Sequence, residues 1–65
     1  MNNIELAFAK AFRGEAGARV IEHLRNITIE RFLGADASDS ALRALEGQRA
    51  LVHQIEKLIE RGKNG

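Results

Sequence analysis

Histidine is the residue type best suited to proton transfer near neutral pH, and the chain has two, His23 and His53. A catalytic or metal-binding role would require both side chains to meet and to recruit carboxylates such as Glu22 or Glu56. The spacing of the two histidines in the sequence gives no reason to expect their side chains to come into contact. Two histidines also fall short of the roughly four ligands of a structural zinc site, and the chain has no cysteine. We therefore predict a non-enzymatic protein with no catalytic residue, metal or cofactor.

The stretch Gly14-Glu15-Ala16-Gly17 has a partial likeness to a glycine-rich phosphate-binding loop. Such a loop follows a β-strand and ends in Lys-Ser or Lys-Thr, and this stretch has neither. It is more typical of a tight turn between two helices, with Gly17 permitting close packing.

Charge is nearly balanced, with 10 basic and 9 acidic residues and a formal net charge of +1. Arg19 follows Glu15, and Arg49 follows Glu46, at spacings that make them neighbours on a helix, so their fields largely cancel. A solvated charged face is therefore favoured over a nucleic-acid-binding face. No segment approaches the roughly 20 apolar residues of a membrane span, so we expect no membrane insertion.

A chain of 65 residues with no proline, rich in alanine, leucine, glutamate and arginine, is typical of a single all-helical domain. Glycine residues divide it into two short N-terminal helices and a longer C-terminal helix. We expect the first two helices to form an antiparallel pair, with the third laid across both. The predicted bounds within a domain spanning residues 1–65 are 3–13, 15–33 and 38–61.

Local signals place the ends of these helices. Asn2 and Glu5 have the spacing of a capping box at the start of the first helix. Gly14 is a natural terminator of that helix. Either Asp36 or Ser38 can cap the third helix. The β-branched run Ile27-Thr28-Ile29 lowers helix propensity, but the chain offers no second strand for it to pair with, so we predict that the second helix continues through it.

The third helix carries an apolar seam at heptad spacing. A second column of Ala44, Leu51 and Leu58 makes its apolar face wider than a two-helix contact requires. This width would leave a strip of the face for another chain. The seam consists of Ala41, Leu45, Gln48, Val52, Ile55 and Ile59.

The stretch Glu46-Gly47-Gln48-Arg49 is unusual, because a glycine inside a helix costs ~1 kcal/mol relative to alanine. One interpretation is a close crossing of this helix over another helix of the same chain, and the other is contact with a second chain. Both interpretations stay open. In a contact with a second chain, Phe12 would be an apolar anchor and Gln48 would fix the register. Glu46 and Arg49 would make charge-assisted hydrogen bonds in the same contact. The predicted protein-interface residues are Phe12, Glu46, Gln48, Arg49 and Val52.

Three stretches together resemble a family of short phage and prophage proteins that are encoded among head and portal assembly genes. They are Ala11-Phe12 with Gly14, then Gly17 to Ile21, and Leu45 to Val52. The resemblance extends from about Phe8 to Ile59 and is most specific at Glu-Gly-Gln-Arg. It implies a role in the phage particle or its assembly and supplies no catalytic residues.

We therefore expect a phage structural or morphogenesis protein that acts through helix-mediated protein contacts in the virion or the host cytoplasm. Its expected partners are phage structural proteins, with further copies of this chain as an open alternative and nucleic acid disfavoured. The alternative function is a small phage regulatory or inhibitor protein that binds a host protein.

Overall fold

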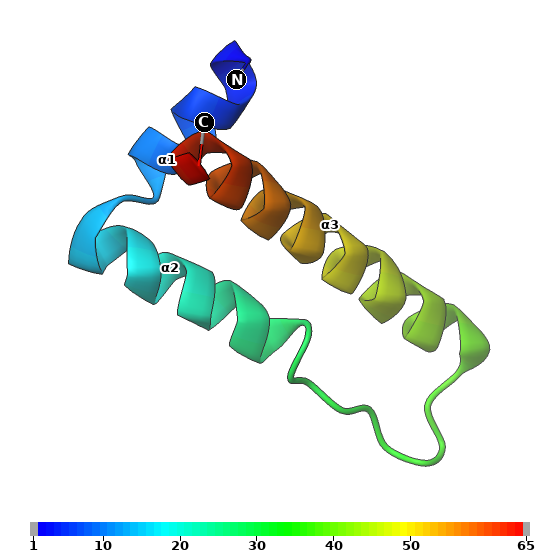
Figure 1. Cartoon of the computed structure of the whole chain (residues 1–65). Helices are drawn as coiled ribbons and strands as arrows, with labels where there is room; N and C mark the ends of the chain where they lie inside the picture. Colours follow the sequence, from blue (N-terminus) through cyan, green and yellow to red (C-terminus); the bar gives the residue numbers. More distant parts are fainter. Residues whose placement is uncertain (1, 65) are drawn as a thin grey trace.

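The computed structural model describes residues 2–64 of the chain, and this range contains three α-helices (Figure 1). They are α1 (Asn3–Ala11), α2 (Gly14–Ile27) and α3 (Asp39–Asn64). No β-strand occurs in this range. The prediction of an all-α fold with two short N-terminal helices and a longer C-terminal helix is confirmed.

The start of α1 is fixed by the predicted capping box. The amide N of Glu5 donates to Oδ1 of Asn2 at 2.8 Å, and the amide N of Asn2 donates to Oε1 of Glu5 at 3.3 Å. These bonds satisfy amides that have no partner within the first helical turn. The helix ends at Ala11, two residues before the predicted end, and the chain turns at Gly14, whose φ is +82°. Glycine adopts this left-handed conformation at little cost.

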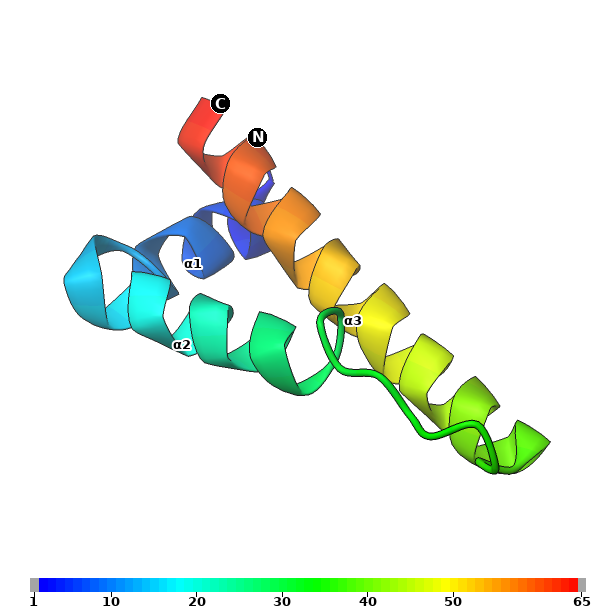
Figure 2. The ribbon, with the colours of Figure 1, turned by 90° about the horizontal axis from the view of Figure 1, so that it is seen from below.

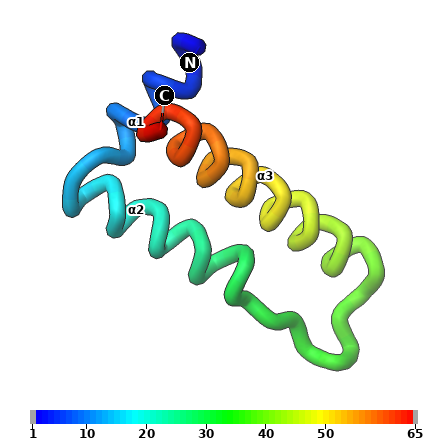
Figure 3. The backbone as a smooth tube through the Cα atoms, in the orientation of Figure 1, coloured from blue at the N-terminus to red at the C-terminus, as the bar shows by residue number. Residues whose placement is uncertain are grey.

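The second helix ends at Ile27, so its predicted extent to Leu33 is wrong. Thr28 leaves the helical conformation with φ −130° and ψ −77°. Its Oγ1 donates to the carbonyl O of Leu24 at 2.5 Å, a local bond of the kind that competes with helix continuation. The β-branched run from Ile27 to Ile29 therefore does mark the end of the helix. Residues 28–38 then carry the chain to the far end of α3 (Figure 3).

The third helix begins one residue after the predicted start and runs three residues past the predicted end. Of the two candidate caps, Ser38 is the one used, because its Oγ accepts from the amide N of Ala41 at 3.1 Å. Arg61 and Lys63 lie in the last turn, where positive charge stabilises the helix dipole. None of the helices in residues 2–64 is long and apolar enough to span a membrane.

The buried apolar core is one column of α3: Leu45, Val52 and Ile59, spaced one heptad apart. Of the predicted seam, Ala41 and Gln48 are exposed instead. The helix packs mainly against α1, which crosses its C-terminal end, and less against α2 (Figure 2). The expected antiparallel pair of α1 and α2 does not form, because the sharp turn at Gly14 directs α2 away from α1.

Two glycines in the structure permit close backbone contact, and Gly47 is not one of them. A Cβ at Gly62 would lie 2.2 Å from the carbonyl O of Glu5 and 2.6 Å from Cβ of Ala9. A Cβ at Gly17 would lie 2.1 Å from the backbone of Phe12. A Cβ at Gly47 would meet nothing within 4 Å. The internal crossing that we considered at Gly47 therefore lies at Gly62, and Gly47 serves no packing purpose within the chain.

The molecule is extended for its length. Its Cα radius of gyration is 14.0 Å, against about 11 Å for a compact domain of this size. Its accessible surface is 4900 Å², against about 4100 Å² for a folded monomer of this mass. The excess surface, about 800 Å², reflects the short core column and the length of α3.

Replacing a glycine of α3 with alanine should change the free energy of unfolding in opposite directions at Gly62 and at Gly47. Gly62→Ala should lower the free energy of unfolding by ~1–3 kcal/mol, because the new Cβ forces α1 away from α3. Gly47→Ala is the matched control and should raise it by up to ~1 kcal/mol through helix propensity. Urea denaturation of dilute protein, followed by circular dichroism, measures both. Equal effects of the two substitutions would contradict the close crossing at Gly62.

Candidate protein-interaction surfaces

The structure does not bring the five predicted interface residues together. Phe12 lies half-buried at the end of α1, where its ring stacks on Phe8 with centroids 6.2 Å apart. Glu46 and Gln48 are exposed on α3, and Arg49 is partly buried. Val52 is only 4% exposed and belongs to the core column, so it is not available to another chain in this fold.

Arg49 reaches from the middle of α3 to the end of α2. Its Nε donates to the carbonyl O of Thr28 at 2.9 Å, and its Nη2 donates to the carbonyl O of Arg31. Its Nη1 donates to the carboxylate of Glu46 on the same helix. Carbonyls at a helix end lack intrahelical partners, and the guanidinium fork supplies donors to this end of α2. The hydrogen bonds that we expected Arg49 and Glu46 to offer another chain are thus made within this one.

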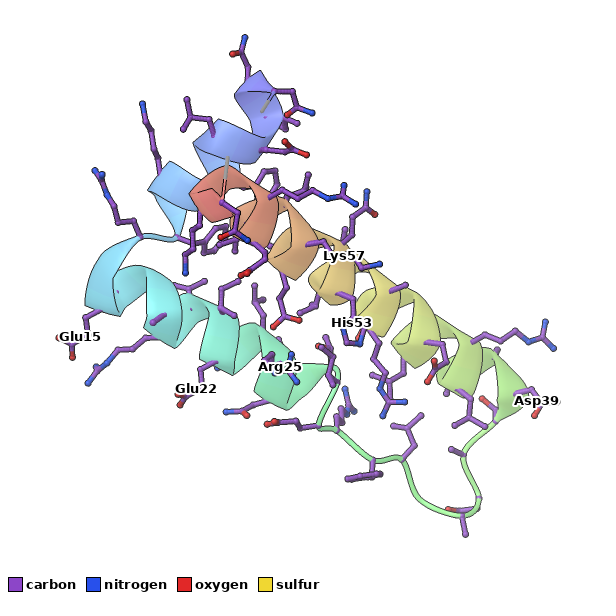
Figure 4. All side chains as sticks on the ribbon, in the orientation of Figure 1. Glu15, Glu22, Arg25, Asp39, His53 and Lys57 are labelled. Carbon is purple, nitrogen blue, oxygen red and sulfur yellow. The ribbon has the colours of Figure 1, made fainter. Side chains whose placement is uncertain are left out.

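A second polar contact ties α2 to α3. Nη1 of Arg25 donates to both carboxylate oxygens of Glu56, at 2.8 and 2.7 Å. This hydrogen bond and the charge of Glu56 raise the pKa of the Arg25 guanidinium above its ordinary value. Nδ1 of His53 lies 3.6 Å from Oε1 of the same carboxylate. Figure 4 shows Arg25 on α2 and His53 on α3.

This bridge has no signal in the sequence, because Arg25 and Glu56 are far apart in the chain and only the packing of α2 along α3 joins them. From the sequence we considered Glu56 as an aid to a histidine pair and not as a partner of Arg25. The other histidine, His23, is exposed on α2 and makes none of the ion pairs found in residues 2–64. The same described part of the chain contains no group of three or more potential metal ligands.

A groove of about 630 Å³ lies between α1, the first half of α2 and the last turns of α3. Its walls are largely apolar, and charged residues, among them Lys10, Arg13 and Glu60, also line it. An apolar centre with a polar rim is the usual anatomy of a protein interface. Of the residues predicted from sequence, only Phe12 lines it. The apolar lining consists of Leu6, Ala9, Phe12, Ala18, Ile21 and Ile59.

Apolar side chains are also exposed away from the groove. Phe32, in the connection between α2 and α3, is 88% exposed, and Leu51 on α3 is 58% exposed. Val20 and Ile27, one heptad apart on α2, are both nearly half exposed. The surface therefore offers several apolar contacts outside the groove as well.

Residues 8–60 match the model of a protein family described as Bbp19-like phage protein. The match includes α2 in full and α3 as far as Glu60. It contains all three stretches on which the resemblance to phage proteins rests. No curated protein and no solved structure shows significant similarity to the chain.

The contacts of Arg49 predict a structural role. Arg49→Met keeps the length of the side chain and removes its donors, so the carbonyl of Arg31 loses its partner and that of Thr28 keeps only the amide N of Arg31, at 3.3 Å. We expect the free energy of unfolding to fall by ~1–2 kcal/mol. Arg43→Met is the control, since Arg43 is exposed on the same helix and makes none of the hydrogen bonds or ion pairs of residues 2–64. Urea denaturation should separate the two variants, and indistinguishable midpoints would rule out the role.

Proposed function

The chain belongs to the family of Bbp19-like phage proteins, and from that membership we propose that it is a structural or morphogenesis protein of the phage particle. In this proposal its gene lies among those for head and portal assembly. The protein works by helix-mediated contacts with phage structural proteins. It acts in the virion or in the host cytoplasm where particles are built.

The observation that supports this proposal most directly is the extended, incompletely buried fold. A radius of gyration of 14.0 Å and a core of three side chains leave much apolar surface in water. Small domains commonly gain the stability that they lack by association. A protein that completes its packing on another protein fits an assembly role.

We assign the contact with the phage structural protein to the groove between α1, α2 and the end of α3. An apolar helix of the partner would lie in it, since helix-in-groove binding uses an apolar floor and charged edges. Phe12 keeps its predicted role as an apolar anchor there. Glu46 and Gln48 lie outside the groove and belong to a different surface.

The alternative is a small regulator or inhibitor that binds a host protein. A protein that mimics DNA would carry a concentrated acidic surface, whereas this chain has 10 basic and 9 acidic residues. The nearly balanced charge therefore favours the assembly role. The location of the protein after infection separates the two functions.

Mass spectrometry of gradient-purified particles tests the proposal. We expect the chain to be present in a fixed ratio to the major capsid protein, or enriched in assembly intermediates if it leaves before maturation. Its absence from both, with abundant protein in the lysate, would contradict the proposal and favour the regulatory alternative.

A pair of alanines on α2 tests the groove. Ala18 lines the groove and Ala16 does not, although both are exposed near the start of the helix. In a phage complemented with the variant gene, Ala18→Arg should reduce incorporation of the protein into particles or intermediates at least tenfold, because a charge fills the apolar floor. Ala16→Arg should leave incorporation unchanged. Equal incorporation of both variants would remove the groove from the proposal.

A further inference from the structure

One face of α3 is left uncovered along the N-terminal half of the helix. With 26 residues, α3 is about 39 Å long, whereas the nine residues of α1 span only about 14 Å. Figures 1 and 2 show α1 at the C-terminal end of α3 and the N-terminal half standing clear of it. The uncovered face contains Ser40, Ala44, Gly47 and Leu51, whose spacing of four, three and four residues is that of a helix-packing seam.

Gly47 is the residue of this face that the fold of the single chain does not explain. Gly17 and Gly62 are required because a Cβ would collide with neighbouring backbone. At Gly47 the space around a Cβ is empty, although glycine is a poor helix former in the middle of the longest helix. Gly62 faces another helix, α1, and Gly17 faces the backbone of Phe12 just past the end of α1, whereas Gly47 has no such neighbour within the chain.

We propose that this face binds a second copy of the same chain, with the two α3 helices antiparallel and the two-fold axis near Gln48. In this arrangement the large Leu51 side chain of each copy packs over the small Ala44 and Gly47 of the other. The two Gln48 side chains come together beside the axis, where their amides can bond to each other. A two-fold interface must be self-complementary in this way, large residue against small.

The charges beside the seam are self-complementary in the same orientation. Asp39 and Lys57 lie five full helical turns apart and so project from the same side of α3. Both are exposed, and neither makes an ion pair within residues 2–64. Because they lie about equally far from Gln48, an antiparallel pair places Asp39 of each copy against Lys57 of the other. A parallel pair would place the two copies of each residue at the same level but on opposite sides of the helix pair, so neither Asp39 nor Lys57 would gain an opposite charge.

The accessible surface of the whole chain is also large enough for a dimer interface. The chain exposes about 800 Å² more surface than a compact monomer of its mass. A stable interface of ordinary size buries about 800 Å² on each partner. None of the four seam residues lines the groove, so the dimer goes beyond the proposed function and its test does not depend on that function.

Sedimentation velocity of the full chain tests the dimer first. We expect a dimer at tens of micromolar. Gly47→Leu should weaken association at least tenfold while the helical circular dichroism is kept, because the single chain has room for the new side chain. Ala16→Leu places the same side chain on exposed α2 and should leave association unchanged. A native chain that stays monomeric, or a dimer unaffected by Gly47→Leu, would overturn the proposal.

Crosslinking then tests the orientation, and the chain has no cysteine to interfere. With a short bismaleimide, Gln48→Cys should form a covalent dimer, since the two positions meet at the axis. Ser40→Cys should not, because the two positions lie on opposite sides of the axis in an antiparallel pair. Efficient crosslinking through Ser40→Cys would indicate a parallel pair and overturn the arrangement.

A charge exchange provides an independent check. Asp39→Lys and Lys57→Asp should each weaken the dimer roughly three- to tenfold, since each replaces two attractive contacts with repulsive ones. The double variant should recover most of the native affinity. Failure of the double variant to recover would exclude the pairing of Asp39 with Lys57.

Discussion

The contact on which this fold depends is the close crossing of α1 over α3 at Gly62. A helix of nine residues is too short to persist alone in water, so α1 forms because it packs. The crossing brings the carbonyl of Glu5 and Cβ of Ala9 to positions that only a glycine on α3 can face. Beside it, Nη1 of Arg61 lies 3.9 Å from the carboxylate of Glu5, which reinforces the same contact. The C-terminal end of α3 is thereby the anchor of the N-terminal helix.

The second helix is held differently. Its contacts with α3 are fewer, and two arginine interactions join the helices at separate points. Arg25 reaches from α2 to Glu56, and Arg49 reaches from α3 to the carbonyls at the end of α2. These contacts specify where α2 lies without burying much apolar surface, and the carboxylate of Glu56 is itself partly exposed. The core consequently remains a single column on α3, and the remaining apolar side chains stay at the surface.

Signals within a few residues of each other were readable from the sequence. The capping box of Asn2 and Glu5, the turn at Gly14 and the heptad spacing of the core column all appear in the structure. The predictions that proved wrong depended on contacts between residues that are far apart in the sequence. From the sequence, Gly47 lies inside the third helix and Gly62 just past its predicted end, and only the position at which α1 crosses decides which one is packed. Likewise, the intramolecular use of Arg49 depends on where α2 ends, and a β-branched run gave the only local sign of that end.

The two proposed surfaces lie on different parts of α3, and this separation has a consequence for assembly. The groove adjoins the last turns of α3, whereas the seam of the proposed dimer, from Ser40 to Leu51, lies on its N-terminal half. An antiparallel pair would therefore place its two grooves at opposite ends of the helix pair, facing two separate partner subunits. Binding at one groove would then raise the effective concentration of the other groove near a neighbouring subunit. A small chain with a weak core could in this way join subunits of a larger assembly, since neither contact would have to be strong alone.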